Sequence, residues 1–554
     1  MQSANKYQEE IFEFFAHGSG NAVINAKAGS GKTYTAVKAL DFIDRTKKVL
    51  FIAFNKDIVR ELSIKVGDRK NTDILTYHAL GLKLFALNYK DFTIDTFKYA
   101  SKLNELLDDN SAFLWLDDKQ KKQYRTNVLS LVDYYRLNFL KTEEDFSYII
   151  NKYGIETVAD EVPTAQKLLD WGRNTIKNID FTDMEWLICE HGIESPKCKY
   201  DWIIIDEAQD SSPLQQTLVM SCLKKNGRFC CIGDNDQTIN AWCGGDEEAF
   251  NKFLSMPNVH TFDLPICYRC AKSIVEKAQE IVPEIEARED APIGSVNYNV
   301  SPYEAKDGDM ILCRNTVPLT TLFNEFIKHN ISAYIRGAEI GNELISLIEK
   351  TDFNTLSADF SYNGVIPTLY RDFFKFLDNF IDEHNISIED ALKDEKVATQ
   401  YSKVKTIELL SEGQTNTAEL EQRISNIFRD DETHGICLST IHKAKGLEAD
   451  NVFILCPSLM PSKTAKQEWE IKAEQNLIYV AITRAKKSLN YISETYFSIK
   501  KGYSDAQTIE EDLNEKRRLL ATLNTGEIQT PLPIKKIGSS TPNKVGAKKF
   551  SKFF

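Results

Sequence analysis

The chain has 554 residues, with 68 Lys and Arg against 81 Asp and Glu, which gives a formal net charge of −13. At roughly 100 to 200 residues per domain, this length predicts about three or four domains. A 42% hydrophobic fraction is enough for several packed cores, so composition excludes a disordered chain. The acidic total does not exclude a nucleic-acid partner, because a local basic groove can bind phosphates while distant faces are acidic.

The opening segment, QSANKYQEEIFEFF after the initial Met, lacks the basic start and the small-residue cleavage site of a signal peptide. No apolar run approaches 18 residues, so we expect no membrane partner and a cytoplasmic protein, in the nucleoid or in a host cytoplasm if viral. The 11 Cys fit free thiols in a reducing compartment. Cys267 and Cys270 have the CxxC spacing of zinc and redox sites, but no second CxxC completes a four-ligand zinc site.

Short apolar runs alternate with helical patterns from residue 20 to residue 78. The runs NAVINA, KKVLFIAF and TDILTY predict buried strands, and GKTYTAVKALDFI and NKDIVRELSIKV predict the helices between them. Residues 85–195 instead contain long polar-helical stretches, which predict a helical insertion. The alternation of predicted strands and helices resumes with the apolar runs WIIID, RFCCIGD and VHTFDL. Strands that alternate with helices predict a parallel sheet with helices on both faces.

A second series begins with DMILCRN and SAYIRG and closes with GICLST, NVFILC and KSLNYIS, after another helical segment. The final segment, TPLPIKKIGSSTPNKVGAKKFSKFF, is basic and predicts a flexible tail. The predicted fold is therefore α/β, with two sheets that each carry a mainly helical insertion. The expected division is a first core (1–84 and 196–285) around insertion 85–195, a second core (286–337 and 431–497) around insertion 338–430, and a C-terminal extension (498–554).

A P-loop pattern follows the first predicted strand. AKAGSGKT, residues 26–33, has Ala26 where the pattern usually begins with Gly. Small residues let backbone N–H groups surround phosphates at a helix N-terminus, Lys32 would reach the outer phosphates, and Thr33 would ligate Mg²⁺. An ordinary Gly-rich turn gives no reason for Lys-Thr to follow. The predicted phosphate-binding residues are Ala28, Gly29, Ser30, Gly31, Lys32 and Thr33.

A carboxylate cluster ends another buried strand, in DWIIIDEAQD at residues 201–210. The carboxyl ends of parallel strands share one edge of a sheet, where ligands bind. If WIIID lies beside VINA, Asp206 meets Thr33 and holds Mg²⁺, while Glu207 polarises an attacking water. The structural alternative is that these residues cap the following helix, SSPLQQTLV, and it fits Asp210 best.

These two motifs together resemble the superfamily 1 helicases, and further motifs follow in the same order. GDNDQTINAWCGG (233–245) is similar to the GDxxQxIYxWxGA motif of the UvrD, Rep and PcrA helicases. LPICYRC resembles their LxxNYRS segment, LSTIHKAKGLEADNVFIL (438–455) their TxHxxKGLE segment, and LIYVAITRAKKSL (477–489) their YVAxTRAK segment. The resemblance implies an ATP hydrolase of two RecA-like P-loop NTPase domains that uses ATP and Mg²⁺ in the cleft between them.

The resemblance also implies roles for residues around the nucleotide. Gln8 would read the adenine, Tyr268 would stack on it, and Glu448 would meet the ribose. Gln237 would sense the γ-phosphate, and two arginines from across the cleft would act as fingers, each worth about 10³ to 10⁵ in rate. The predicted catalytic residues are Lys32, Asp206, Glu207, Gln237, Arg269 and Arg484.

Contacts to single-stranded DNA are implied by the same resemblance. Phe54 lies in AFNK, which is shorter than the usual UvrD segment and closer to the F-box DNA helicases. Trp242 would stack on a base, worth about 1 to 3 kcal/mol. Asn240 and Cys243 stand where the family usually has Tyr and often Arg, and core packing is the alternative for each lone His or Trp. The predicted DNA-binding residues are Phe54, Asn55, His78, Trp242, Arg314, Thr440 and His442.

The resemblance thus implies a helicase or translocase that moves 3′ to 5′ on single-stranded DNA and meets junctions with duplex DNA. The alternative is a DNA-stimulated ATPase that displaces proteins with little unwinding, which only a strand-displacement assay separates. In the tail, Phe550, Phe553 and Phe554 resemble a sliding-clamp-binding peptide with Ala547 in place of Gln. A basic arm that holds phosphates is the other interpretation of this segment.

Overall fold

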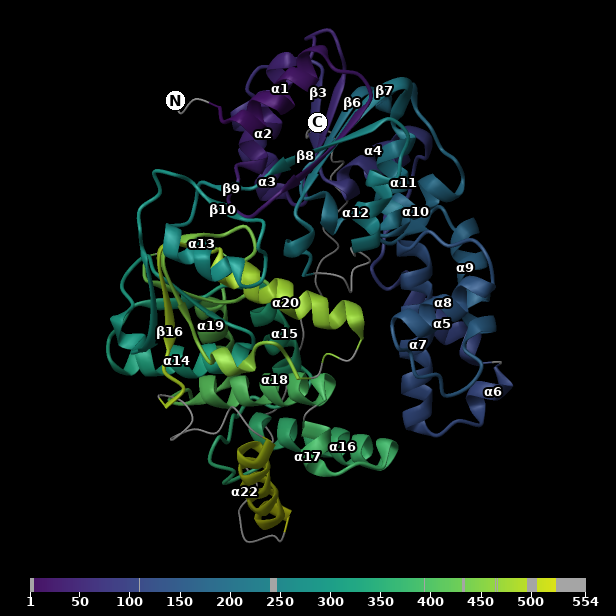
Figure 1. Cartoon of the computed structure of the whole chain (residues 1–554). Helices are drawn as coiled ribbons and strands as arrows, with labels where there is room; N and C mark the ends of the chain where they lie inside the picture. Colours follow the sequence, from purple (N-terminus) through teal and green to yellow (C-terminus); the bar gives the residue numbers. More distant parts are fainter. Residues whose placement is uncertain are drawn as a thin grey trace.

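The computed structural model describes residues 4–108, 110–239, 247–392, 394–430, 434–463, 465, 467–495 and 506–524. Two six-stranded sheets dominate these residues (Figure 1), and every strand pair in both is parallel. The predicted α/β class with helix-covered parallel sheets is confirmed. We call the first sheet and the elements up to residue 264 the first lobe, and the elements from residue 266 onward the second lobe.

The sheet of the first lobe has six strands, which in spatial order are β3 (Thr72–Leu75), β2 (Val49–Ile52), β6 (Tyr200–Ile205), β7 (Leu223–Gly233), β1 (Asn21–Ala26) and β8 (Val259–Leu264). Its surrounding helices are α1 (Lys6–His17), α2 (Lys32–Ala39), α3 (Lys56–Val66), α4 (Tyr77–Asn88), α11 (Pro213–Ser221) and α12 (Glu247–Leu254). WIIID does not lie beside VINA as expected, because β7 separates β6 from β1.

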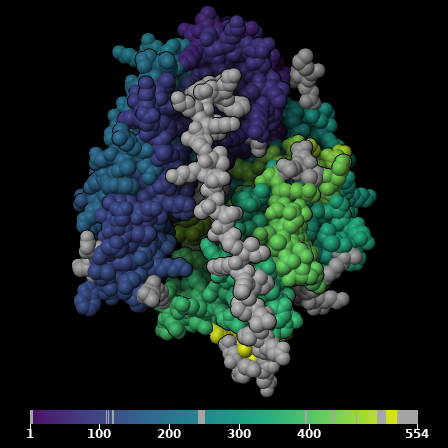
Figure 2. Space-filling view, turned by 180° about the vertical axis from the view of Figure 1, so that it is seen from behind, coloured from purple at the N-terminus to yellow at the C-terminus, as the bar shows by residue number. Residues whose placement is uncertain are grey.

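The first insertion forms a helical arm along one side of the molecule, seen from behind as blue atoms in Figure 2. Its elements are β4 (Thr93–Ile94), α5 (Lys98–Asp108), α6 (Ser111–Leu114), α7 (Asp118–Leu137), α8 (Glu144–Lys152), α9 (Val162–Asn174), β5 (Asn178–Ile179) and α10 (Asp183–Glu190). Asp183 is fully buried and accepts hydrogen bonds from Lys98 Nζ at 2.5 Å, Tyr99 OH at 2.8 Å and Arg136 Nη1 at 3.0 Å. This ionic cluster ties α5, α7 and α10 together.

The sheet of the second lobe has six strands, which in spatial order are β11 (Ser295–Val300), β16 (Ala485–Ile492), β15 (Ala449–Ile454), β12 (Met310–Cys313), β14 (Ile436–Thr440) and β13 (Ala333–Ile335). Its other elements are β9 (Ile266–Cys267), α13 (Lys272–Gln279), β10 (Glu286–Ala287), α14 (Thr316–Lys328), α15 (Ala338–Glu349), α16 (Val365–His384), α17 (Ile388–Leu392), α18 (Glu395–Ser411), α19 (Thr417–Ile427), α20 (Glu468–Ile482) and α22 (Ala506–Asn524).

Three features of the second lobe were not predicted. Strand β11 is a polar edge strand without a continuous apolar run. Helix α13 precedes the boundary expected at residue 285, yet it packs against β11, β16 and α20. Helix α22, within the expected C-terminal extension, packs against α16 and α17. The basic tail after residue 524 lies outside the described residues.

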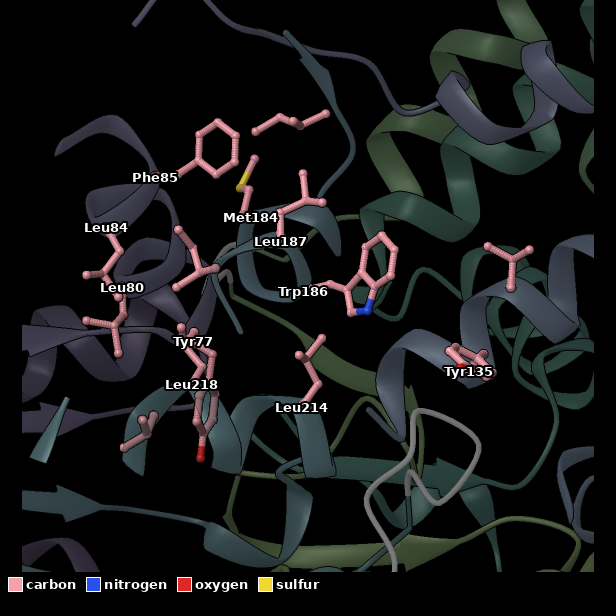
Figure 3. Close-up of a cluster of buried hydrophobic side chains, with 14 of the residues drawn as sticks. Tyr77, Leu80, Leu84, Phe85, Tyr135, Met184, Trp186, Leu187, Leu214 and Leu218 are labelled. Atoms are coloured by element: carbon pink, nitrogen blue, oxygen red, sulfur yellow. The ribbon is translucent and has the colours of Figure 1, made fainter. Parts of the chain in front are cut away.

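Each lobe has a core on both sides of its sheet, because successive strand residues point to opposite faces. In β6, Ile203 and Ile205 join a cluster with the insertion, whereas Trp202 and Ile204 pack with α1, α2 and α3. Figure 3 shows how side chains of α4, α10 and α11 point toward one another in the first of these clusters. The second insertion likewise shares a core with its sheet, so both insertions are continuous with their lobes.

None of the helices among the described residues is both long enough and apolar enough to cross a membrane.

Candidate nucleotide site between the lobes

The P-loop connects β1 to α2 at the carboxyl edge of the first sheet. Gly29 and Gly31 have φ angles of 68° and 84°, in the left-handed region that Gly adopts without steric cost. Helix α2 begins directly afterwards, at Lys32. Ser30 is buried, and its Oγ has no hydrogen-bond partner among the described residues. Left-handed glycines, a helix N-terminus and an unsatisfied buried hydroxyl fit a phosphate group.

The predicted metal ligands meet although their strands are not adjacent. Thr33 Oγ1 donates to Asp206 Oδ2 at 3.1 Å, because the first turn of α2 reaches past β7 toward the end of β6. Lys32 Nζ lies 3.2 Å from the Ala26 carbonyl oxygen and 4.0 Å from Glu207 Oε2. A hydroxyl and a buried carboxylate are oxygen ligands of the kind that Mg²⁺ prefers, so the donor set fits that ion.

Opposite electrostatic effects act on the two neighbouring carboxyls. Burial and the charge of Glu207 raise the pKa of Asp206. Burial would also raise the pKa of Glu207, but Lys32, Lys445 and Arg484 hold it below its ordinary value. Glu207 has a φ of 51°, a rare conformation for a residue with a side chain. The chain therefore holds an ionised carboxylate in a strained position, surrounded by cations of both lobes.

Asp210 does not cap the helix that follows it, so that interpretation is wrong. The N-cap of α11 is Ser212, which forms a capping box with Gln215. Asp210 instead accepts hydrogen bonds at 2.6 and 2.8 Å from Lys445 Nζ, which belongs to the second lobe. The same ammonium donates to the Gln237 carbonyl oxygen at 2.7 Å. Ser212 is the N-cap because it directly precedes the first helical residue, Pro213.

Arg484 crosses from the second lobe to the predicted γ-phosphate sensor. Its Nη2 lies 3.5 Å from Gln237 Oε1, while the Gln237 amide donates to Asp234 Oδ2 at 2.6 Å. The Arg484 side chain is fully buried, and burial together with the charge of Arg269 lowers its pKa to about 10. Among the residues that the structure describes, no carboxylate forms an ion pair with Arg484, so this buried cation could bind an anion.

Arg269 lies on the same side of the cleft, next to the predicted ribose contact. Its Nε forms a 2.6 Å ion pair with Glu448 Oε2, and its Nη1 donates to the Thr483 carbonyl oxygen at 3.2 Å. Glu448 also pairs with Lys486 at 2.7 Å. Burial would raise the pKa of Glu448, but Lys486 and Arg269 lower it overall. Arg269 and Glu448 therefore neutralise each other in this arrangement.

The predicted adenine contacts gather at the start of α1. Tyr268 N–H donates to the Gly29 carbonyl oxygen at 2.8 Å, and its hydroxyl accepts from Asn5 Nδ2 at 2.7 Å. Gln8 is buried, and its Nε2 donates to Thr35 Oγ1 at 3.2 Å. Its Oε1 accepts from Asn5 N–H in the capping box of α1. The structure thus brings Tyr268 and Gln8 against the P-loop and its helix.

The predicted DNA contacts of the first lobe follow two strands of its sheet. Phe54 and Asn55 follow β2 after one further residue, and both are exposed. Asn55 caps α3 by accepting from Ile58 N–H. His78 is the second residue of α4, and its Nδ1 lies 3.4 Å from the buried Glu185. Trp242, Asn240 and Cys243 lie outside the described residues.

The predicted DNA contacts of the second lobe follow β12 and β14. Arg314 Nη2 and Nε bind Glu474 Oε1 at 2.7 and 3.0 Å. Burial and the charge of Arg314 lower the pKa of His442 to about 4, so His442 is neutral at physiological pH. Thr440 Oγ1 accepts from Lys443 N–H at 3.4 Å. These residues lie together at the carboxyl edge of the second sheet.

Sequence reasoning missed several residues that join the lobes. Besides Lys445, Tyr479 accepts a hydrogen bond at its hydroxyl from the Ala28 N–H of the P-loop at 3.1 Å. Asn476 Nδ2 donates to the Thr238 carbonyl oxygen at 2.9 Å. Lys472 of the second lobe lies 3.4 Å from Asp236 of the first, which also pairs with Lys27 at 2.7 Å. Lys445 and Tyr479 stand inside the quoted helicase motifs, which was the available signal for them.

The structure describes both thiols of the CxxC pair, Cys267 and Cys270. Among the described residues, no group of three or more His, Cys, Asp or Glu side chains is arranged to hold a metal ion. Every cysteine in these residues is a free thiol.

Comparison of the sequence with known proteins identifies its family. The chain matches the UvrD-like helicase C-terminal domain model over residues 39–496 and the model of the type III restriction enzyme res subunit over residues 2–75. It is 25% identical over 644 aligned residues to the ATP-dependent DNA helicase PcrA of Staphylococcus aureus (strain Mu50), with 93% of this chain and 87% of the relative covered. Identity to PcrA of Staphylococcus epidermidis (strain RP62A) is 24%, over 92% and 86%. Since one family model spans most of its length, the chain belongs to the UvrD-like helicase family.

Proposed function

We propose that the protein is an ATP-dependent DNA helicase that translocates 3′ to 5′ on single-stranded DNA in the cytoplasm and hydrolyses ATP between its lobes. One observation carries the proposal: Lys32 of the first lobe lies 4.0 Å from Glu207, and Arg484 of the second lobe lies 3.5 Å from Gln237 of the first. Cations of both lobes therefore lie beside the same group of first-lobe side chains. Both relatives are named DNA helicases, which favours unwinding over protein displacement alone.

The P-loop would hold the phosphates, with backbone N–H groups and Ser30 Oγ as donors. Thr33 and Asp206 would hold Mg²⁺, and their 3.1 Å contact supports this assignment. When bound, the ion neutralises charge on the phosphate oxygens. Lys32 would exchange its contact with the Ala26 carbonyl oxygen for the outer phosphates.

Glu207 would orient the attacking water, because its lowered pKa keeps it ionised and able to accept a proton. Arg484 and Arg269 would neutralise charge that develops on the transferred phosphoryl group. Gln237 belongs to the first lobe and lies 3.5 Å from Arg484 of the second, so it would link occupancy of the site to closure. Hydrolysis would then require both lobes, and their relative movement would drive translocation.

The nucleoside would lie where Tyr268 and Gln8 meet the P-loop, with Tyr268 stacking on the adenine. Glu448 would contact the ribose beside Arg269. For DNA, we propose a path along the carboxyl edges of both sheets, which is where ligands bind open α/β sheets. The contacts along it would be Phe54, Asn55, His78, Trp242, Arg314, Thr440 and His442.

Two finer assignments also belong to this proposal. The first assignment is the division of the chain into seven parts, namely the segments of the two cores, the two insertions and the C-terminal extension. Helix α13 precedes the boundary at residue 285 but packs on the second sheet. The other is a sliding-clamp contact through Phe550, Phe553 and Phe554, which lie outside the described residues. Deleting residues 547–554 tests it: clamp affinity should fall, and an unchanged affinity leaves the segment as a basic arm.

The decisive experiment measures unwinding of duplexes that carry a 3′ or a 5′ single-stranded overhang, with and without ATP. We expect ATP-dependent unwinding from the 3′ overhang only. Lys32→Ala and Glu207→Gln should abolish DNA-stimulated ATP hydrolysis, and Glu207→Gln should still bind nucleotide. Lys38→Ala is the matched control, because Lys38 lies on the same helix but pairs with Asp41 at the surface. Unchanged turnover in Glu207→Gln would overturn its role, and unwinding from the 5′ overhang would reverse the polarity.

A further inference from the structure

Two thiols lie side by side in the buried cluster where the two lobes meet. Cys267 ends β9, and Cys270 lies just before α13. Both are buried, with exposed fractions of 0% and 3%. Cys270 N–H donates to Cys267 Sγ at 3.4 Å, and the Cys270 thiol is within hydrogen-bond reach of the same sulfur. The two sulfurs are therefore neighbours and not merely close in sequence.

The pair touches both halves of the nucleotide site. A Cβ placed on Gly29 of the P-loop would lie only 2.8 Å from Cys267 Sγ. On the other side, Cys270 Sγ lies 3.7 Å from the Thr483 carbonyl oxygen. That oxygen also accepts the hydrogen bond of Arg269. Any change in the bonding of the two sulfurs is thus transmitted to the P-loop and to an arginine of the site.

The two thiols differ in reactivity. The hydrogen bond from Cys270 and those from neighbouring backbone N–H groups outweigh burial and lower the pKa of Cys267 to about 6. The pKa of Cys270 is raised, so this residue keeps its proton. The thiolate is the nucleophilic form of cysteine, and CxxC spacing is one setting that produces it. The site therefore pairs an attacking thiolate with a protonated neighbour.

We propose that Cys267 and Cys270 form a reversible disulfide that turns off hydrolysis when a peroxide enters the cleft. The Cys267 thiolate attacks hydrogen peroxide, the O–O bond breaks, and Cys267 sulfenic acid and hydroxide result. Cys270 Sγ then attacks the Cys267 sulfur, so the S–S bond forms and the oxygen leaves as water with the thiol proton. A dithiol reductant reverses the reaction by thiol–disulfide exchange. Because both sulfurs are buried, the peroxide enters when the lobes separate.

The expected consequence follows from what the disulfide encloses. The new ring contains Tyr268 and Arg269, and the Cys270 thiol no longer reaches the Thr483 carbonyl oxygen. Constraint of this turn displaces the Arg269 guanidinium from its position near Thr483. An arginine finger is worth about 10³ to 10⁵ in rate, so even a partial displacement lowers turnover by roughly tenfold or more. This effect on turnover rests on the proposed function, whereas formation of the bond does not.

The bond is tested first, by peptide mapping of the full-length protein. Trypsin cleaves after Arg269, so the two cysteines fall on separate peptides unless a disulfide joins them. After treatment with hydrogen peroxide, non-reducing digestion should give the linked pair, and dithiothreitol should separate it. Cys456→Ser is the matched control, because Cys456 is also buried next to another thiol, Cys313. The linked pair should persist in Cys456→Ser and vanish in Cys270→Ser; its absence from the unmutated protein overturns the proposal.

Turnover is tested second. Peroxide should lower DNA-stimulated ATP hydrolysis roughly tenfold or more, and dithiothreitol should restore it. Cys270→Ser should hydrolyse ATP and resist peroxide, because serine keeps a donor toward the Thr483 carbonyl oxygen and is the family residue in LxxNYRS. Cys456→Ser should respond like the unmutated protein. If the linked peptide forms and ATP turnover stays unchanged, the disulfide does not turn off hydrolysis and that part of the proposal is refuted. No turnover even in the reduced protein refutes the proposed function instead, and the peptide map then decides on the disulfide alone.

Discussion

The lysine that joins the lobes offers a direct test of whether hydrolysis depends on closure. Lys445 Nζ contacts both carboxylate oxygens of Asp210 and the Gln237 carbonyl oxygen. The Asp210 side chain is only 1% exposed and that of Lys445 14%. Burial raises the pKa of Asp210, and Lys445 opposes this effect. Replacing Lys445 with Met keeps much of the side-chain volume but leaves a buried carboxylate without its cation.

The size of the effect follows from the energy of hydrogen bonds to charged groups. Each is worth about 1.5 to 3 kcal/mol net, and the loss of a buried partner costs about 3 to 5 kcal/mol. Separation of the lobes would hydrate Asp210 and relieve this cost, and so would protonation, because the pKa of Asp210 is already raised. We therefore take the cost of losing this contact as about 1.5 to 3 kcal/mol. With about 1.4 kcal/mol per factor of ten, Lys445→Met should shift the equilibrium toward open lobes by about 10- to 100-fold.

The assay is DNA-stimulated ATP hydrolysis at saturating DNA. We expect kcat to fall by about 10- to 100-fold in Lys445→Met, while binding of nucleotide to the P-loop changes little. Lys443→Met is the matched control, because Lys443 is exposed and pairs with Glu339 within the second lobe. A double-mutant cycle with Asp210→Asn should show that the two changes are not additive. Equal turnover in Lys445→Met and Lys443→Met would refute the reasoning that this contact closes the cleft.

Three further predictions concern stability and DNA affinity. Asp183→Asn leaves Lys98 buried without its carboxylate, while Arg136 keeps Asp133 and Asp180, so chemical denaturation should show a loss of about 3 to 5 kcal/mol; a loss near zero would mean that the arm relaxes around the site. Burial raises the pKa of Glu185 from 4.5 to about 8. Within that window the folded protein holds a proton that the unfolded chain lacks, so stability falls as pH rises, by about 1.4 kcal/mol per pH unit. Glu185→Gln should remove this slope in thermal unfolding between pH 5 and pH 8, and parallel curves would contradict the assignment. Affinity for single-stranded DNA should fall by about 0.7 log units per log unit of salt for each neutralised phosphate, and a flat titration would contradict a phosphate-binding groove.

Local sequence patterns predicted the elements that carry continuous apolar runs. The runs NAVINA, WIIID and GICLST are β1, β6 and β14 within a residue or two. Elements without such runs were missed, namely the edge strand β11 and helix α22. An edge strand can be polar because one of its sides faces solvent, and a helix held only by tertiary packing leaves a weak signal.

The sequence by itself determined the family, the α/β class and the residue types of the phosphate site, because glycines, Lys-Thr and paired carboxylates follow strands at fixed spacing. Only the tertiary structure decided which residues meet. Strand order placed β7 between β6 and β1, yet Asp206 still reaches Thr33. Asp210 binds Lys445 and does not cap α11, although 235 residues separate Asp210 and Lys445 in sequence. Spacing along the chain fixes local conformation, whereas contacts across the cleft depend on how the two cores pack.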